Sequence, residues 1–193
     1  MLNIIIFGPP GAGKGTQSQR LVARFQLGYI STGDALRSEI AAGTAVGRKA
    51  KALIDQGQLV PDELVLDIVH HVVVGETQSH RKKGILFDGF PRTVAQAEQL
   101  DRMLEAEHTE ITCLVSLLVP QEELMQRILI RAQTSGRSDD NEETIANRLQ
   151  EYQKKTQPVA EYYKKLNKFI EVDGTGTPDE IASRLADVIN KCK

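Results

Sequence analysis

The stretch Gly8-Pro9-Pro10-Gly11-Ala12-Gly13-Lys14-Gly15-Thr16 follows directly on a short apolar run at residues 2–7, and this junction decides the class of fold. Glycines allow successive backbone N–H groups to turn inward and surround a phosphate chain. The helix that we expect to begin at Lys14 directs its positive end at the same anion. The Lys14 ammonium can then reach the terminal phosphates. A strand, this loop and a helix in that order predict a phosphate-binding loop for a nucleoside triphosphate.

The loop departs from the general phosphate-loop pattern in one place. The core spacing, Gly-x4-Gly-Lys, is present, but Gly15 follows the lysine and the hydroxyl falls one place later, at Thr16. The alternative is a glycine-rich turn without a ligand, which the density of glycines and prolines beside a lysine disfavours. The motif by itself indicates triphosphate binding and does not identify the phosphoryl acceptor.

Short apolar runs alternate with longer helical patterns along the chain. We expect strands at residues 2–7, around 28–30, and at 84–88, 111–119 and 169–172. We expect helices at residues 14–25, from a capping box at 31–34 through residue 40, and at 93–105, 121–131 and 178–189. A capped start at residues 140–143 opens a further long helix, which must kink or restart at Pro158. This alternation predicts an α/β fold of three layers, α/β/α, around a five-stranded parallel sheet.

Two segments do not fit the alternation of strand and helix. Residues 31–75 hold several helical patterns that are broken by Gly43, Gly47 and Gly57 and restarted at Pro61. Residues 132–139 form a polar loop between two helices. Excursions of this kind from a sheet are candidates for moving parts.

Composition excludes several classes of protein. The 193 residues are 40% apolar and 26% charged, which supports a sizeable core and excludes global disorder. With a net charge of −2, the chain lacks the excess of positive charge that is typical of proteins that bind nucleic-acid polymers or membranes. The two cysteines, Cys113 and Cys192, have no metal-ligand spacing, so we expect no zinc site. The apolar run at residues 2–7 is too short for a signal sequence or a membrane span, and we expect a cytoplasmic protein.

A second chemical motif, Phe87-Asp88-Gly89-Phe90-Pro91-Arg92, ends the third expected strand. An acid at the carboxyl end of a strand beside a phosphate loop can organise the Mg²⁺ that accompanies ATP, usually through water. The alternative for Asp88 is a turn-forming Asp-Gly pair. The proline in this motif stiffens the turn and would hold the Arg92 guanidinium in place.

Four motifs in order make a family resemblance: GPPGAGKGTQ at residues 8–17, STGDALR at 31–37, DGFPRTVAQA at 88–97 and SGRSDDNEETIANR at 135–148. Together they resemble the adenylate kinase family, essentially from Leu2 to the C-terminus. The resemblance implies a P-loop NTPase fold and reversible transfer of the terminal phosphoryl group of ATP to AMP, giving two ADP. The displaced hydroxyl at Thr16 is usual in nucleoside-monophosphate kinases. The short segment between Arg131 and Asp139 resembles the short-lid form, which lacks zinc-binding cysteines.

The resemblance also assigns residues to sites. It implies an ATP site at Gly11, Ala12, Gly13, Lys14, Gly15, Thr16, Arg127, Arg131 and Gly176. It implies an AMP site at Thr32, Arg37, Gln58, Leu59, Val60, Gly89, Phe90, Pro91, Arg92, Gln96, Arg137 and Arg148. Catalysis would rest on Lys14, Arg92, Arg131, Arg137 and Arg148, and Mg²⁺ would be held by Thr16 and Asp88, mostly through water.

The resemblance further implies a monomer and a single domain, residues 1–193. We expect its core at residues 1–30, 61–130 and 141–193, an NMP-binding excursion at 31–60 and a short lid at about 131–140. The two excursions would close over the nucleotides to exclude water. The middle of the chain suits this chemistry, because between Lys83 and Lys154 all the basic side chains other than histidine are arginines, whose planar forks bind phosphate bidentately.

Three other functions share some of these motifs. A UMP or CMP kinase shares the phosphate loop and the DGFPR turn, but Thr32 and Gln96 match the residues that read adenine. A phosphate-loop switch or motor ATPase would need a guanine-reading motif or a nucleic-acid-binding surface. A non-catalytic nucleotide-binding module would not need Lys14, Asp88 and the set of arginines together. The partners that we expect are therefore ATP and AMP, with ADP in the reverse direction.

Overall fold

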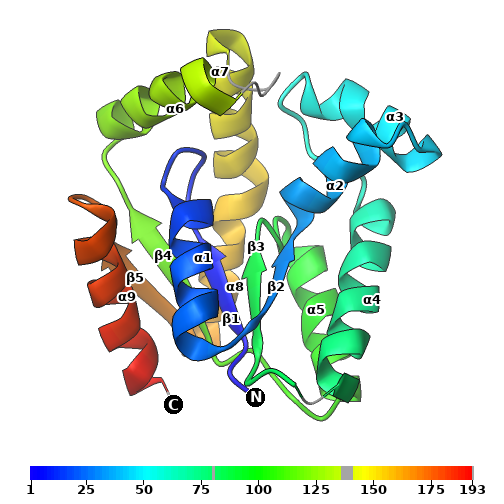
Figure 1. Ribbon diagram of the computed structural model, residues 1–193, viewed down its shortest axis with the longest axis vertical. Helices are drawn as coiled ribbons and strands as arrows, with labels where there is room; N and C mark the ends of the chain where they lie inside the picture. The colour runs from blue at the N-terminus through cyan, green and yellow to red at the C-terminus, as the bar shows by residue number, and fades with distance from the viewer. Residues whose placement is uncertain (80, 136–140, 193) are drawn as a thin grey trace.

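The chain forms a five-stranded parallel sheet in the order β2-β3-β1-β4-β5 (Figure 1). The computed structural model describes residues 1–79, 81–135 and 141–192. The strands are β1 (Ile4–Phe7), β2 (Gly28–Ser31), β3 (Ile85–Asp88), β4 (Cys113–Leu118) and β5 (Phe169–Asp173). Each pair of neighbouring strands is parallel. This sheet confirms the predicted fold class.

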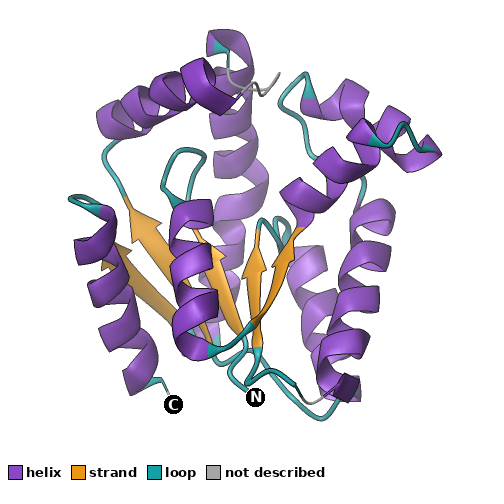
Figure 2. Cartoon of the chain, in the orientation of Figure 1, coloured by secondary structure: helices purple, strands orange, loops and turns teal. Residues whose placement is uncertain are grey.

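Helices cover both faces of the sheet, as Figure 2 shows. The α-helices in the described residues are α1 (Lys14–Phe25), α2 (Thr32–Ala41), α3 (Ala45–Ile54), α4 (Asp62–Ser79), α5 (Val94–Ala106), α6 (Gln121–Ser135), α7 (Glu142–Glu151), α8 (Gln157–Lys165) and α9 (Pro178–Lys191). Helices α1 and α9 pack on one face, and α4, α5 and α8 pack on the other. Helices α2 and α3 and helices α6 and α7 stand above the carboxyl ends of the strands, on either side of the phosphate loop (Figure 1).

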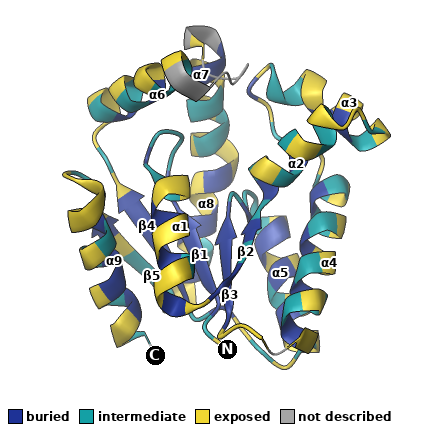
Figure 3. Ribbon diagram, viewed as in Figure 1, coloured by how far each residue is buried: buried dark blue, intermediate teal, exposed yellow. Residues whose placement is uncertain are grey.

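The core lies on the two faces of the central strands. Along β1, Ile5 and Phe7 join the apolar cluster under α4, α5 and α8, while Ile4 and Ile6 join the cluster under α1 and α9. A parallel strand that is buried on both faces reads as a continuous apolar run, and β1 and β3 are fully buried in Figure 3. The short central strands therefore form a rigid support whose carboxyl ends carry the loops described below.

The helix expected from residue 140 toward Pro158 differs in detail from its prediction. Asp140, which we expected to cap it, lies outside the described residues, and Asn141 is the N-cap, its side chain accepting from the Thr144 N–H at 3.0 Å. As expected, the chain restarts a helix at Pro158, which lies in the first turn of α8. It widens one turn earlier into a π-helix, Tyr152–Thr156, closed by a bond from the Gln157 N–H to the Tyr152 carbonyl. Proline obstructs the normal α-helical bond to the preceding turn, and the wider turn accommodates this.

The prediction that Gly47 breaks a helix is wrong. Gly43, with φ +64°, separates α2 from α3 as expected, but Gly47 lies inside α3. A Cβ atom at Gly47 would lie 2.1 Å from the Glu39 carbonyl oxygen, so glycine is required there for the close packing of α3 on the end of α2. The described part of the chain has no helix that is long and apolar enough to cross a membrane.

Candidate active site

Two cavities open at the carboxyl end of the sheet. The smaller, of about 140 Å³, is enclosed by α2, the segment at residues 54–60, the β3–α5 turn and the end of α7. The larger, of about 810 Å³, surrounds the phosphate loop and reaches α6 and the start of α9. Their linings share four cationic side chains: Lys14, Arg37, Arg92 and Arg148. The two cavities therefore meet where positive charge is concentrated.

The phosphate loop folds as the glycines require. Gly11 and Gly13 have φ values of +85° and +88°, and a Cβ at Gly11 would lie 2.8 Å from the Leu124 carbonyl oxygen. The expected contact residues Gly11, Gly13, Gly15 and Thr16 line the larger cavity. Ala12 does not line it: this residue is buried, and its N–H donates to the Pro9 carbonyl at 3.2 Å.

The Lys14 side chain folds back over the loop. Its ammonium donates to the carbonyl oxygens of Gly8 at 2.8 Å and Pro9 at 3.0 Å. Burial lowers the pKa of Lys14 to about 8, Asp88 opposes this fall, and the guanidinium groups of Arg92, Arg148 and Arg131 add to it. Positive charge therefore exceeds negative charge around Lys14, which suits an anionic ligand.

The Asp88 carboxylate stands beside the loop, where the sequence placed it. Its Oδ2 accepts from the Ser18 hydroxyl at 3.3 Å and from the Tyr29 hydroxyl at 3.1 Å. Burial, followed by the charge of Asp88, raises the pKa of Tyr29 to about 12, so this hydroxyl stays a donor. Asp88 and Thr16 both line the larger cavity.

These oxygen groups fit a magnesium ion. Mg²⁺ is usually held by one or two carboxylates with phosphate oxygens and water, and Asp88 with the Thr16 hydroxyl supplies such a partial set. Among the described residues, no group of three or more His, Cys, Asp or Glu side chains is placed to hold a metal ion. Magnesium bound here would therefore depend on the phosphates of its nucleotide.

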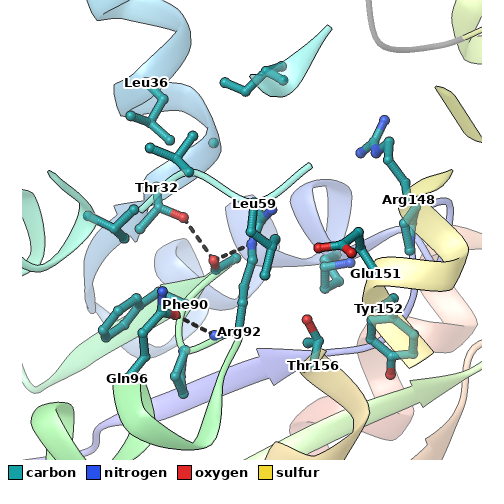
Figure 4. A pocket seen from close by; sticks show the side chains of 18 of the residues that line it. Thr32, Leu36, Leu59, Phe90, Arg92, Gln96, Arg148, Glu151, Tyr152 and Thr156 are labelled. Atoms are coloured by element: carbon teal, nitrogen blue, oxygen red, sulfur yellow. Dashed lines mark hydrogen bonds between the residues drawn. The ribbon is translucent and has the colours of Figure 1, made fainter. Parts of the chain in front are cut away.

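The turn after β3 organises one end of the smaller cavity (Figure 4). The carbonyl oxygen of Gly89 accepts from the Thr32 hydroxyl at 2.8 Å and from Arg92 Nε at 2.7 Å. A Cβ at Gly89 would lie 2.9 Å from the Arg92 guanidinium, and its φ is +75°. The glycine thus permits the guanidinium to fold back across the turn, and Arg92 is held at the junction of the two cavities.

The Gln96 side chain lies on the floor of this cavity and is 2% exposed. Its Oε1 accepts from the Arg92 N–H at 2.7 Å, and its Nε2 donates to Asp62 Oδ1 at 2.6 Å. The predicted residues Gln58, Leu59, Val60, Phe90 and Pro91 line the same cavity. Most of the expected AMP residues are thus brought together, as Figure 4 shows for its labelled members.

The remaining predicted arginines have different surroundings. Arg37 pairs with Asp34 one helical turn away. Arg131 lines the larger cavity, and Arg137 lies outside the described residues. Arg127 pairs with Glu123 at 2.5 Å and donates to the carbonyl oxygens of Ala12 and Gly174, so it joins the phosphate loop to the loop that carries Gly176.

The end of the excursion rests against α7, which places Arg148 over the smaller cavity. The Thr144 hydroxyl donates to the Asp55 carbonyl at 3.1 Å. Gly57, with φ +71°, approaches so closely that a Cβ there would lie 2.8 Å from the Thr144 carbonyl oxygen.

Sequence reasoning missed several residues that line the smaller cavity. Apolar walls come from Leu36, Ile54 and Val65. A polar wall comes from Glu151, Tyr152 and Thr156, which lie at the end of α7 and along the π-helix. Pro158 predicted an irregular helix here, but nothing in the sequence pattern indicated that the irregular turn faces the smaller cavity.

A phosphate loop after the first strand of a parallel sheet, beside two joined cavities with shared cations, defines a P-loop protein of the nucleoside-phosphate-binding class. The comparisons with known proteins are more specific. A family model described as adenylate kinase matches residues 6–168, and the chain belongs to the adenylate kinase family.

Full-length relatives agree with this assignment. The adenylate kinase of Phocaeicola vulgatus is 50% identical over 191 residues, which cover 99% of this chain and 100% of the relative. That of Parabacteroides distasonis is 46% identical over 193 residues and covers both chains completely. That of Thermus thermophilus is 46% identical over 182 residues, 94% of each chain.

Proposed function

We propose that this protein transfers the terminal phosphoryl group of ATP to AMP, reversibly, giving two ADP. The observation that carries the proposal is the pair of cavities that meet at Lys14, Arg37, Arg92 and Arg148. Two phosphate chains that enter from opposite sides would converge on these cations. The full-length similarity to adenylate kinases supports the same activity.

Phosphoryl transfer between nucleotides needs little covalent chemistry from the protein. The acceptor is a phosphate oxygen of AMP that is already anionic, so no general base is required. The protein's task is to hold the two phosphate chains in line and to neutralise the charge between them.

The donor side is the larger cavity. The backbone N–H groups of Gly11 and of residues 13–16, with the positive end of α1, bind the phosphates of ATP. The Lys14 ammonium exchanges its two carbonyl partners for the terminal phosphates. When bound, Mg²⁺ neutralises part of the phosphate charge, and Asp88 and Thr16 are the groups that would hold it, mostly through water.

The acceptor side is the smaller cavity. Its apolar walls, which include Leu36, Val60 and Val65, enclose the adenine ring of AMP, and the Gln96 amide contacts the edge of the base. Arg37, Arg92 and Arg148 bind the AMP phosphate. We assign Arg137 to the same phosphate by family resemblance, and Arg127 and Gly176 to the ATP adenine.

Closure of the excursions completes the site. Residues 31–60 close over AMP and residues 131–140 close over ATP, while residues 1–30, 61–130 and 141–193 form the core. Exclusion of water keeps ATP from being hydrolysed before AMP binds.

The protein is expected to work as a monomer in the cytoplasm, and light scattering after size-exclusion chromatography checks the oligomeric state.

One assay tests the activity. Purified protein is mixed with ATP, Mg²⁺ and, separately, AMP, CMP, UMP and GMP, and the diphosphate products are separated by chromatography. ADP should form efficiently with AMP alone as acceptor. Formation of CDP or UDP at a higher rate would instead support a pyrimidine-nucleotide kinase. No diphosphate with any acceptor would refute phosphoryl transfer to monophosphates.

A variant tests the arginine assignment. Arg137→Lys keeps one positive charge but loses the bidentate fork, so it should lower kcat far more than it raises the KM for either nucleotide. A defect confined to KM would refute a role of Arg137 in stabilising the transition state of phosphoryl transfer.

A further inference from the structure

Asp62 has no role in the function proposed above, yet its carboxylate is hydrogen-bonded to Gln96, the side chain that contacts the adenine base of AMP in that proposal. It lies in the first turn of α4, and its Oδ1 accepts from Gln96 Nε2 at 2.6 Å. Its Oδ2 accepts from the hydroxyl of Thr93, the N-cap of α5, at 3.4 Å. Asp62 therefore joins the starts of two helices beside Gln96, which lines the smaller cavity.

We propose that Asp62 is a positioning residue that makes the site select 6-aminopurine over 6-oxopurine monophosphates, because it holds the Gln96 amide in a single orientation. The inference rests on the proposed function, since it places the base of AMP in the smaller cavity.

The Gln96 amide has two unlike neighbours. The backbone N–H of Arg92 can only donate, and it donates to Gln96 Oε1 at 2.7 Å. An ionised carboxylate can only accept, and Asp62 receives the N–H of Nε2. If the amide were turned over, an N–H would face the Arg92 N–H and an oxygen would face the carboxylate. Both hydrogen bonds would be lost and replaced by repulsive contacts.

Burial makes this loss costly. Gln96 is 2% exposed, so water has little access to a side chain whose bonds are broken. The helix around it is also fixed, because the Gln96 N–H donates to the Thr93 hydroxyl at 3.1 Å. Hydrogen bonds consequently hold the Gln96 backbone and both polar atoms of its side-chain amide.

The locked amide retains one N–H and one oxygen lone pair for the cavity. The six-membered ring of adenine presents an acceptor at N1 beside a donor at its 6-amino group, and an amide matches that pair with one donor and one acceptor. Hypoxanthine presents the reverse, a donor at N1 beside an acceptor at O6. A 6-oxopurine can form the same pair only with the amide turned over, which Asp62 and the Arg92 N–H oppose.

The test is the ratio of kcat/KM for AMP to kcat/KM for IMP, measured with saturating MgATP. Asp62→Asn is nearly isosteric and keeps an oxygen for Thr93, but its amide can donate to a turned-over Gln96. Glu63→Gln is the matched control, because Glu63 is an exposed acid in the same helical turn and loses the same charge in the same way. Asp62→Ser is the second variant if thermal unfolding shows that Asp62→Asn is not folded.

Asp62→Asn and Asp62→Ser should each lower the AMP:IMP ratio about tenfold or more, the value of one hydrogen bond to a charged group. Glu63→Gln should leave the ratio unchanged. A purely structural role would lower both efficiencies alike and leave the ratio as in the unaltered protein, and that result would overturn the inference. Failure of the unaltered protein to make ADP from AMP would instead overturn the proposed function, so the two failures are distinguishable.

Discussion

Binding of a triphosphate above neutral pH should take up a proton, because Lys14 is held where its positive charge is disfavoured. Burial lowers the pKa of Lys14 to about 8, and Arg92, Arg148 and Arg131 add to the fall. Its hydrogen-bond partners in the structure are neutral carbonyl groups of Gly8 and Pro9. Phosphate oxygens would bring negative charge to the ammonium and raise its pKa again.

The size of the uptake follows from the two pKa values. At pH 8.5 a group with a pKa of about 8 is protonated in roughly a quarter of the free molecules. If bound phosphates return the pKa to about 10.5, the ordinary value, nearly every complex carries the proton. Binding should then take up about 0.75 proton per nucleotide at pH 8.5, and only about 0.1 at pH 7.

Isothermal titration calorimetry measures this uptake directly. A non-hydrolysable ATP analogue is titrated in two buffers that differ in ionisation enthalpy, at pH 7 and at pH 8.5. Lys14→Arg is the control, because a guanidinium keeps the charge but does not titrate in this range, so its uptake should be near zero at both pH values. If the unaltered protein takes up no proton at pH 8.5, the assignment to Lys14 is refuted. It is also refuted if the proton uptake persists in Lys14→Arg.

Three further predictions concern the acceptor site, the fold and closure. Arg92→Lys loses the Nε bond to Gly89 and the planar fork, and should lower kcat about 100-fold in steady-state assays; a change below threefold would contradict its catalytic assignment. Asn141→Ala removes the N-cap of α7 and should lower the free energy of unfolding by about 1 kcal/mol, seen as a Tm about 2–4 °C lower. A bisubstrate analogue should reduce the radius of gyration in small-angle scattering, and an unchanged value would count against closure of residues 31–60 and 131–140.

The parts of the fold that sequence predicts well are those decided by local chemistry. The start of α1 at Lys14 follows from the glycines before it, and the buried strands follow from continuous apolar runs. Gly47 shows where local signals fail. A glycine inside a helical pattern usually weakens it, but here the close packing of α3 on the end of α2 requires one, and that contact is tertiary.

In the candidate site, too, the residues in local motifs could be predicted and those placed by tertiary structure could not. Gly11, Lys14, Asp88 and Arg92 lie in short motifs whose spacing carries their chemistry. The structure brings all four to the larger cavity, and Lys14 and Arg92 line both cavities. The wall made by Glu151, Tyr152 and Thr156 could not be predicted, because a π-helical turn shifts which side chains face inward. Asp62 was missed for another reason: an acid in a first helical turn is expected for capping alone.

The absence of lysine between Lys83 and Lys154 acquires a physical reason from the structure. Burial, together with the guanidinium charges of Arg92, Arg148 and Arg131, lowers the pKa of Lys14, which lines both cavities, to about 8. A second ammonium among these groups would meet the same burial and the same like charges, and it would lose part of its charge near neutral pH. Arginine does not deprotonate under such conditions, so a dense cation cluster must be built from it. The net charge of −2 therefore conceals a site in which the choice of arginine is as important as the number of positive charges.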